Sequence, residues 1–230
     1  MATAQNHLIE QLVCKDRLHL LGRCEPVSLV PGTVLCEPAK PTRHVYFPID
    51  GFISLVAPVD AKPALEVGLV GREGMLGARL ALGVMTTPLH ALVQGSGTAW
   101  RMGAKDFRGE LARCAALQRV VDRYLYVLMA QLATSAVCVR FHQIGPRLAR
   151  RLLMSQDRAH ADSFAVTQEF LAYMLGVRRV GITAAAVALQ RGGLIKYRRG
   201  NVTVLDRSGL EAAACPCYAI DRQAYDIALP

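Results

Sequence analysis

The sequence lacks the short motifs that accompany the commonest catalytic chemistries. It contains no Walker phosphate loop, no HExxH zinc helix and no GxSxG nucleophile turn. Its six histidines are scattered, with no two closer than twelve residues, so the clustered ligands of a cupin-type metal enzyme are missing. We therefore expect neither an enzyme nor a cofactor.

The sequence also shows no signal peptide and no apolar run that we expect to span a membrane. The first 21 residues are amphipathic and have no continuous apolar region of the kind that a signal peptide needs. The apolar run near residues 180–190 is too short for the roughly 20 residues of a membrane span. We therefore predict a cytoplasmic protein without a membrane partner.

The seven cysteines do not form the even, regular pattern of a disulfide framework. Cys14, Cys24 and Cys36 lie too far apart for the tight spacing of an iron–sulfur motif, and we interpret them as structural thiols. The pair Cys215 and Cys217 is more unusual, and a metal or redox role is one hypothesis. A structural zinc site needs four ligands, and only these two are close in sequence, so no metal site is predicted.

Acidic residues are absent between Glu169 and Asp206, whereas the stretch from 175 to 200 carries six Lys or Arg. The whole chain has a formal net charge of +9, and residues 139–230 contribute 13 basic against 7 acidic side chains. A basic cluster is often only a solvated face. Six cations without an acid on one compact segment instead favour nucleic acid as the partner.

The chain has two kinds of hydrophobic pattern, one typical of strands and one typical of helices. Residues 26–104 carry short apolar runs, such as HVYFPI and LEVGLV, separated by Pro, Gly and Asp turn signals. Short strands at regular intervals are typical of an antiparallel sandwich or barrel. Residues 5–21 and the chain beyond Lys105 show helical spacing instead. The predicted fold class is α+β, with an N-terminal antiparallel β sandwich or barrel followed by helices.

A helix predicted after Lys105 has residues spaced alternately four and three positions apart, which is the spacing of a coiled-coil seam. The helix either pairs with a second copy of the chain or packs on its own barrel, and we expect a dimer seam. The seam residues are Leu117, Val121, Tyr124, Leu128, Gln131 and Ser135.

A pair of short helices follows in the basic segment. Thr167 stands at a good N-cap position, and Gly176 is suited to end the first helix with positive φ. A second helix is expected from about Arg178 to Gln190, only two or three residues later. Two short helices joined by a glycine-containing turn form a helix-turn-helix. The next residues, LIKYRRGNVTVLD, indicate a small hairpin or wing.

Three segments, FHQIGPRLARRLL, TQEFLAYMLGVRRVGITAAAVALQRGGLI and VTVLDRSGLE, resemble the DNA-binding half of the Crp/Fnr family of bacterial transcription regulators. The resemblance implies a jelly-roll sensor domain over residues 1–110, a dimerisation helix and hinge over 111–140, and a winged helix-turn-helix over 141–230. It also implies a homodimer that binds a pseudo-palindromic DNA operator, with RNA polymerase as a further partner.

The resemblance assigns roles to residues of the second helix and the wing. Arg178 and Arg179 stand where the family contacts base edges, and a helix that enters the major groove reads bases from its N-terminal end. Thr183 and Ala184 are further candidates for base contacts, although larger polar residues stand at Ala184 in some members. The expected phosphate contacts are Thr167, Arg191, Lys196, Arg198 and Arg199.

The barrel departs from the cyclic-nucleotide pattern of the family's founding sensor. The matching turn has glycines, but Gly74 is followed by Met75 where that pattern has Glu, and the later Arg is missing. A structural remnant is the simpler interpretation, and an isolated histidine such as His44 is a poor haem ligand. If an effector pocket exists, we expect it to be formed by Gly71, Arg72, Glu73, Gly74, Arg79 and His90.

We therefore expect a homodimeric, sequence-specific DNA-binding transcription regulator that responds to an unidentified signal. The alternative is a ligand-binding jelly-roll module whose winged helix serves protein–protein contacts.

Overall fold

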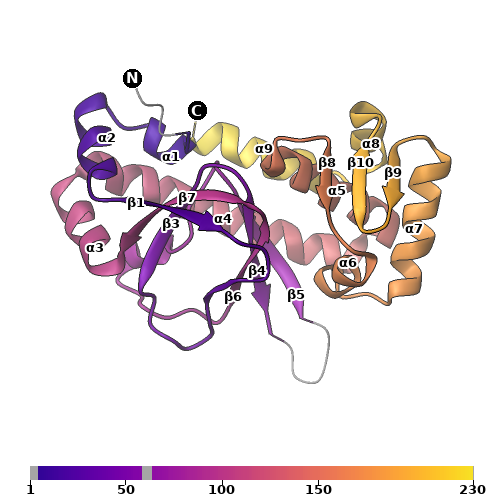
Figure 1. Ribbon diagram of the computed structural model, residues 1–230, viewed down its shortest axis with the longest axis horizontal. Coiled ribbons are helices and arrows are strands. Elements are labelled where there is room, and N and C mark those ends of the chain that lie inside the picture. Colours follow the sequence, from indigo (N-terminus) through magenta and orange to yellow (C-terminus); the bar gives the residue numbers. More distant parts are fainter. Residues whose placement is uncertain (1–4, 59–63, 230) are drawn as a thin grey trace.

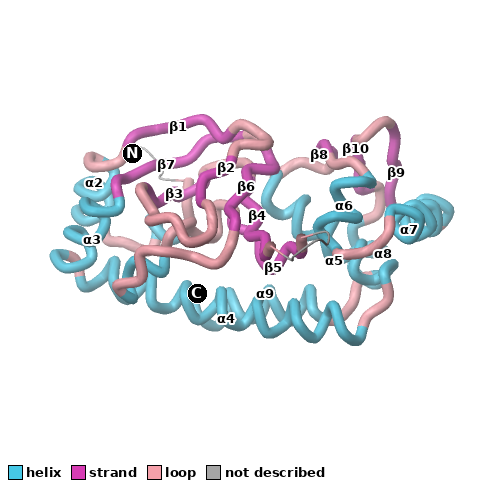
Figure 2. The backbone as a smooth tube through the Cα atoms, turned by 90° about the horizontal axis from the view of Figure 1, so that it is seen from below, coloured by secondary structure: helices cyan, strands magenta, loops and turns pink. Residues whose placement is uncertain are grey.

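The computed structural model describes residues 5–58 and 64–229, and it has a strand-rich half and a helical half (Figure 1). One long helix, α4, runs beneath both halves (Figure 2). Two short helices precede the first strand, namely α1 (His7–Glu10) and α2 (Cys14–Leu21). Strands and helices follow one another along the chain in the order predicted from the two hydrophobic patterns.

The strand-rich half is a sandwich of two antiparallel sheets, which confirms the predicted sheet domain. One sheet has the order β1-β7-β3 and the other the order β2-β6-β4-β5. Their facing surfaces bury aliphatic side chains such as Ile53, Val70 and Val93, so the space between the sheets is filled. The elements are β1 (Glu25–Leu29), β2 (Val34–Cys36), β3 (His44–Pro48), β4 (Phe52–Ala57), β5 (Leu65–Val70), the 3₁₀ helix η1 (Ala78–Leu82), β6 (His90–Gly95) and β7 (Gly97–Gly103).

Helices α3 (Ala104–Arg113) and α4 (Ala115–Phe141) close one side of this sandwich. Phe107 of α3 packs edge-on against Phe47 of β3, with ring centroids 6.1 Å apart. Helix α4 is long and apolar enough to cross a membrane by length and composition. Its inner face is buried in the core, and its opposite face leaves several large apolar side chains exposed.

The inner face of α4 corrects the predicted dimer seam. Leu117, Val121 and Tyr124 are almost completely buried within their own chain, and Gln131 is buried too. A Cβ atom added to Gly74 of the barrel would overlap the Tyr124 ring, so this approach is close. The sequence prediction was wrong because the four-three spacing marks any buried helical stripe, and here the partner is intramolecular. The remaining two predicted positions lie on the same side, with Leu128 against the core and Ser135 bonded to the carbonyl of Val67 in β5.

The helical half contains a three-stranded sheet with the order β8-β10-β9. Two of these strands form the predicted wing, and the third, which precedes α6, was not predicted from the sequence. The elements are α5 (Ile144–Ala159), β8 (Ser163–Ala165), α6 (Gln168–Leu175), α7 (Arg179–Arg191), β9 (Ile195–Arg198), β10 (Asn201–Val204), α8 (Arg207–Ala213) and α9 (Cys217–Ala228).

Helix α9 leaves the winged sheet and runs back along α4 toward the barrel (Figure 1). Its Tyr225 hydroxyl accepts a hydrogen bond from Nε2 of Gln131 at 3.1 Å, and Ala228 joins the core that contains α1 and α3. The C-terminal residues therefore pack on the strand-rich half, although their sequence follows the wing.

Buried ion pairs connect the two halves through α5. Arg151 pairs with Glu66 of β5 at 2.5 Å and donates to Gln94 of β6 at 3.0 Å. Arg158 pairs with Glu73 of the turn after β5 at 2.8 Å. Both arginines are buried, and so α5 is held to the barrel by charges that water does not screen. These arginines belong to the basic C-terminal part of the sequence, residues 139–230, but they act inside the protein.

Removal of Glu66 should be far more damaging than removal of a surface partner. Glu66→Ala leaves the Arg151 guanidinium buried without its carboxylate, which costs about 3–5 kcal/mol in comparable buried pairs. The control is Glu25→Ala, because the Glu25–Arg101 pair at 2.8 Å is exposed and should contribute little. Chemical unfolding followed by circular dichroism measures both changes, and equal losses would contradict a special role for the buried pair.

Candidate nucleic-acid interface

Helix α6, the first helix of the pair, has a cap at each end. The Thr167 hydroxyl oxygen accepts a hydrogen bond from the backbone N–H of Phe170 at 3.1 Å, which starts α6. Gly176 ends that helix with φ of 63°, a conformation that favours glycine. The two helices then meet with a bend of 112°, which lies within the range of helix-turn-helix motifs. The predicted positions of both caps are confirmed.

Helix α7 is anchored by a narrow apolar stripe. Ile182, Ala186 and Leu189 are buried in the core of the helical half, with Leu148 of α5 and Leu171 of α6 in the same cluster. In addition, Nη2 of Arg147 donates to the carbonyl oxygen of Leu175 at 2.5 Å, so α5 also holds the last turn of α6. The orientation of α7 is thus set by packing on two helices.

The other side of α7 faces solvent at the end of the molecule away from the barrel (Figure 1, Figure 2). Arg178 is the N-cap residue, and Arg179 begins the helix. Ala184 is exposed on the same helix, and Val180 is 72% exposed, which is unusual for a large aliphatic side chain in a helix. The exposed surface therefore combines two cations with small or apolar side chains.

Thr183 is exposed, but its hydroxyl group already has partners. It donates to Oε1 of Gln168 at 2.7 Å and lies 3.1 Å from the carbonyl oxygen of Arg179. This bond links α7 to the first residue of α6. A contact between Thr183 and a base would accordingly use the methyl group of its side chain.

The wing turns at Arg199 and Gly200, which both have positive φ, at 48° and 79°. This is the two-residue turn that matches the twist of a β-hairpin. The hydroxyl group of Tyr197 donates to the carbonyl oxygen of Val166 at 2.6 Å, and burial raises the pKa of Tyr197 to about 12. The wing is therefore fastened to the segment that leads into α6, while Lys196 and Arg198 remain exposed on it.

The structure separates the basic residues of this half into two groups. The arginines of α5 are buried or paired, as in the 2.6 Å contact between Arg150 and Asp221. By contrast, no ion pair with an acid is found, within residues 5–58 and 64–229, for the cations of α7 and the wing. This second group is exposed to solvent and comprises Arg178, Arg179, Arg191, Lys196, Arg198 and Arg199. Their charge is available to an external polyanion.

Residues 146–213, which contain this pair of helices and the wing, match the family model of the Crp-like helix-turn-helix domain. The chain carries a Crp-like domain. A comparison of the sequence with curated proteins found no match.

Solved structures extend the likeness to the rest of the chain. FixK2 from Bradyrhizobium japonicum has a TM-score of 0.71 at 12% identity, over 84% of this chain and 98% of its own. The c-di-GMP-responsive global regulator CLP of Xanthomonas campestris has a TM-score of 0.67 at 18% identity, over 84% and 99%. A Crp/Fnr-family transcriptional regulator from Thermus thermophilus has a TM-score of 0.64 at 22% identity, over 83% and 98%. At these identities the likeness shows the fold alone, and it is the fold of Crp/Fnr regulators.

The residues predicted to form an effector pocket do not come together. Glu73 is engaged by Arg158, and Gly71 and Gly74 lie against Arg158 and Tyr124 with no room for a Cβ atom. The last two side chains lie elsewhere. Arg79 donates to the hydroxyl oxygen of Thr42, and His90 pairs with Val56, toward the end of β4 away from this turn. The predicted pocket was wrong, because the turn after β5 serves the contact between the two halves.

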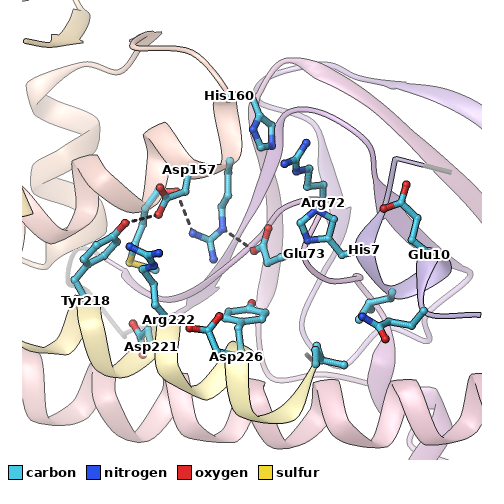
Figure 3. A pocket seen from close by; sticks show the side chains of 16 residues that line it. His7, Glu10, Arg72, Glu73, Asp157, His160, Tyr218, Asp221, Arg222 and Asp226 are labelled. Carbon is cyan, nitrogen blue, oxygen red and sulfur yellow. Dashed lines mark hydrogen bonds and ion pairs between the residues drawn. The ribbon is translucent and has the colours of Figure 1, made fainter. Parts of the chain in front are cut away.

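Arg72 and Glu73 of that prediction line a cavity, which lies between the barrel turn, α5 and α9 and has a volume of about 500 Å³ (Figure 3). Side chains of both charges converge on it, including Arg158 and Asp157 of α5. The Tyr218 hydroxyl donates to a carboxylate oxygen of Asp157 at 2.9 Å. The cavity is polar and interdomain rather than enclosed by the jelly roll.

Two further residues, which were not identified from the sequence, lie beside the pair Cys215 and Cys217. Cys215 and Cys217 are buried, and the fold brings Cys138 and His142 from the end of α4 beside them. Cys138 and His142 are four residues apart, so one helical turn places them on one side of the helix end. That spacing was the available signal, but the distance of over 70 residues to Cys215 concealed the cluster.

The cap at Gly176 should be sensitive to a single methyl group. Gly176→Ala places a Cβ atom at φ of 63° and 3.2 Å from Leu65 Cδ1, so we expect a loss of about 1–2 kcal/mol in unfolding free energy. The matched control is Gly109→Ala within α3, where nothing lies within 4 Å, which should stabilise by about 0.5–1 kcal/mol. Thermal unfolding of both variants tests the signs, and a stabilising Gly176→Ala would contradict the cap.

Proposed function

We propose that the protein is a homodimeric, sequence-specific DNA-binding transcription regulator that binds a pseudo-palindromic operator. The observation that carries the proposal is the set of six exposed cations on α7 and the wing, which have no acidic partner among the described residues. The Crp-like domain over 146–213 supports the same function. Two α7 helices would enter successive major grooves, about 34 Å apart along the DNA.

The cations divide into two tasks by their positions. Arg178 and Arg179 stand at the N-terminal end of α7, where side chains reach base edges, and Arg pairs well with guanine. Lys196, Arg198 and Arg199 belong to the wing or its turn and would bind phosphates, as would Arg191 at the end of α7. Thr167 would add a phosphate contact from the start of α6. Val180 and Ala184 would allow the helix to approach the groove closely.

Dimerisation would use the outer face of α4 in place of the stripe predicted from the sequence. Tyr126, Met129, Ala133 and Ala136 are exposed and recur at intervals of three, four and three residues. This spacing lines one side of a helix and suits a seam between two α4 helices. Met129 is 62% exposed, and the adjoining Leu132 and Val137 add apolar area. A second copy would cover this face.

The buried pairs offer a route from the sensor half to α7. Glu66 and Glu73 of the barrel bond to α5, and Arg147 of α5 bonds to the end of α6. A signal that moves the turn after β5 would therefore bias the position of the helix pair. RNA polymerase is the expected partner of the DNA-bound dimer, as the resemblance implies.

Arginine substitutions in α7 and the wing should affect binding in different ways. Arg179→Ala should reduce discrimination between operator and random DNA by about tenfold or more, since a bidentate base contact is worth about 1–3 kcal/mol. Arg198→Ala should instead weaken binding to all sequences and lower the salt slope by about one per subunit. Competition binding at several salt concentrations, on an operator selected from random DNA, separates the two effects.

The control for both variants is Arg108→Ala, an exposed cation of α3 at the barrel end of the molecule. It should leave operator binding unchanged. A selection that enriches no sequence would contradict sequence-specific binding and favour the alternative, in which the winged helix contacts a protein.

A charge placed on the outer face of α4 should separate the subunits. Met129→Glu would bury a carboxylate in the apolar seam, so we expect a monomer in sedimentation equilibrium at concentrations where the native chain is dimeric. The control is Leu82→Glu, an apolar residue on the barrel that is 65% exposed and outside the seam. If Met129→Glu remains dimeric with the native dissociation constant, another surface forms the dimer.

A further inference from the structure

Three cysteines and a histidine converge at the junction of the long helix and the C-terminal segment. The ligand atoms of Cys138, His142, Cys215 and Cys217 all lie within 4.8 Å of one another. Sγ of Cys138 is 3.6 Å from Sγ of Cys215, and Sγ of Cys217 is 3.6 Å from Nδ1 of His142. The three thiols are at most 4% exposed. The group is thus compact, buried and rich in soft ligand atoms.

The spacing of these atoms matches a tetrahedral metal site. With zinc–sulfur bonds of about 2.3 Å, two sulfur ligands of a tetrahedral zinc ion stand about 3.8 Å apart. A sulfur and a nitrogen ligand stand about 3.6 Å apart in the same geometry. The observed separations, 3.6 Å for Cys138–Cys215 and 3.6 Å for Cys217–His142, are both close to these values. Four protein ligands close the coordination shell, which is the arrangement of structural rather than catalytic zinc.

We propose that Cys138, His142, Cys215 and Cys217 bind one Zn²⁺ ion as a closed Cys₃His structural site. Each cysteine binds as a thiolate, so the three thiol protons leave when the ion enters, and His142 binds through Nδ1 as a neutral imidazole. The occupied site then carries a net charge of −1. No ligand changes oxidation state.

The surroundings favour a site of this charge. The guanidinium groups of Arg147 and Arg150 are close enough to act electrostatically on the cysteine cluster. Positive charge around buried thiolates stabilises the form that binds metal.

A disulfide between Cys138 and Cys215 explains less of the geometry. It would use two of the three sulfur atoms and give no role to the Nδ1 atom of His142 beside Cys217. A purely structural thiol cluster likewise has no need of a histidine. Zinc accounts for all four ligand atoms at once, and it suits the reducing cytoplasm in which we expect the protein.

The position of the site gives it a structural consequence. Cys138 lies in the last turn of α4, His142 is the C-cap of that helix, Cys215 follows α8 and Cys217 begins α9. One ion would therefore join the end of α4 to the point where the chain leaves the winged domain. Such a clamp fixes the hinge between the two halves.

The first test measures metal in the tag-free, full-length protein purified in the presence of a thiol reductant. Mass spectrometry of the metal content should give about one zinc per chain, and the native protein stripped of metal should bind Co²⁺ with the absorption of a tetrahedral thiolate complex. A stripped native protein that takes up neither Zn²⁺ nor Co²⁺ would overturn the proposal. A dominant Cys138–Cys215 disulfide in peptide mapping of reductant-free protein that holds no zinc would overturn it too.

Variants then assign the ligands. Cys217→Ser and His142→Ala should each lower the zinc content by more than about half and weaken Zn²⁺ binding at least about tenfold. Cys36→Ser is the matched control, since Cys36 is buried in the barrel away from the cluster and should keep full zinc content. Equal zinc content in the His142 and Cys36 variants would exclude His142 as a ligand.

Stability provides a readout that does not depend on DNA. Removal of zinc with a chelator should lower the thermal midpoint of the native chain by more than about 5 °C, and added Zn²⁺ should restore it. An unchanged midpoint would contradict a structural role. Zinc binding without operator binding would leave this site intact and refute only the proposed function, so the two failures are distinguishable.

Discussion

The structure depends on how α4 divides its surface, with one face packed on the rest of the chain and the other exposed. One face of this helix, with Leu117, Val121 and Tyr124, is buried against the barrel, α1 and α9. The other face keeps Tyr126, Met129 and Phe141 exposed. Because both faces are apolar, hydrophobic periodicity alone does not say which one meets the same chain. Once the inner face is assigned to the barrel, the outer face remains exposed to solvent.

A similar division applies to the positive charge. Arginine in the sequence of α5 looks the same as arginine in α7, yet the two helices use it differently. Arg151 and Arg158 are buried and neutralised by Glu66 and Glu73, which joins the halves. The cost of burying a charge is offset only by such pairing. The cations of α7 and the wing stay exposed, so the basic surface is smaller than the sequence charge suggests but better placed for a polyanion.

The cysteines illustrate why some sites escape sequence reasoning. Cys215 and Cys217 draw attention by their spacing, but two ligands do not make a closed zinc site. The other two come from the end of a helix more than 70 residues earlier, and only the return of the chain along α4 brings them together. The same is true of the effector turn. Its glycines are a local signal, but their close packing on Tyr124 and Arg158 is a tertiary one.

The sequence by itself determined the local features of this protein, because caps, turns and periodicity act over a few residues. Thr167 and Gly176 set the bounds of α6, the stripe through Ile182 and Leu189 oriented α7, and Arg199–Gly200 formed the wing turn. The tertiary structure alone decided which face of α4 is internal, which arginines are free and which ligands surround Cys215. Those outcomes depend on contacts between residues far apart in the chain, for which the same local pattern permits more than one partner.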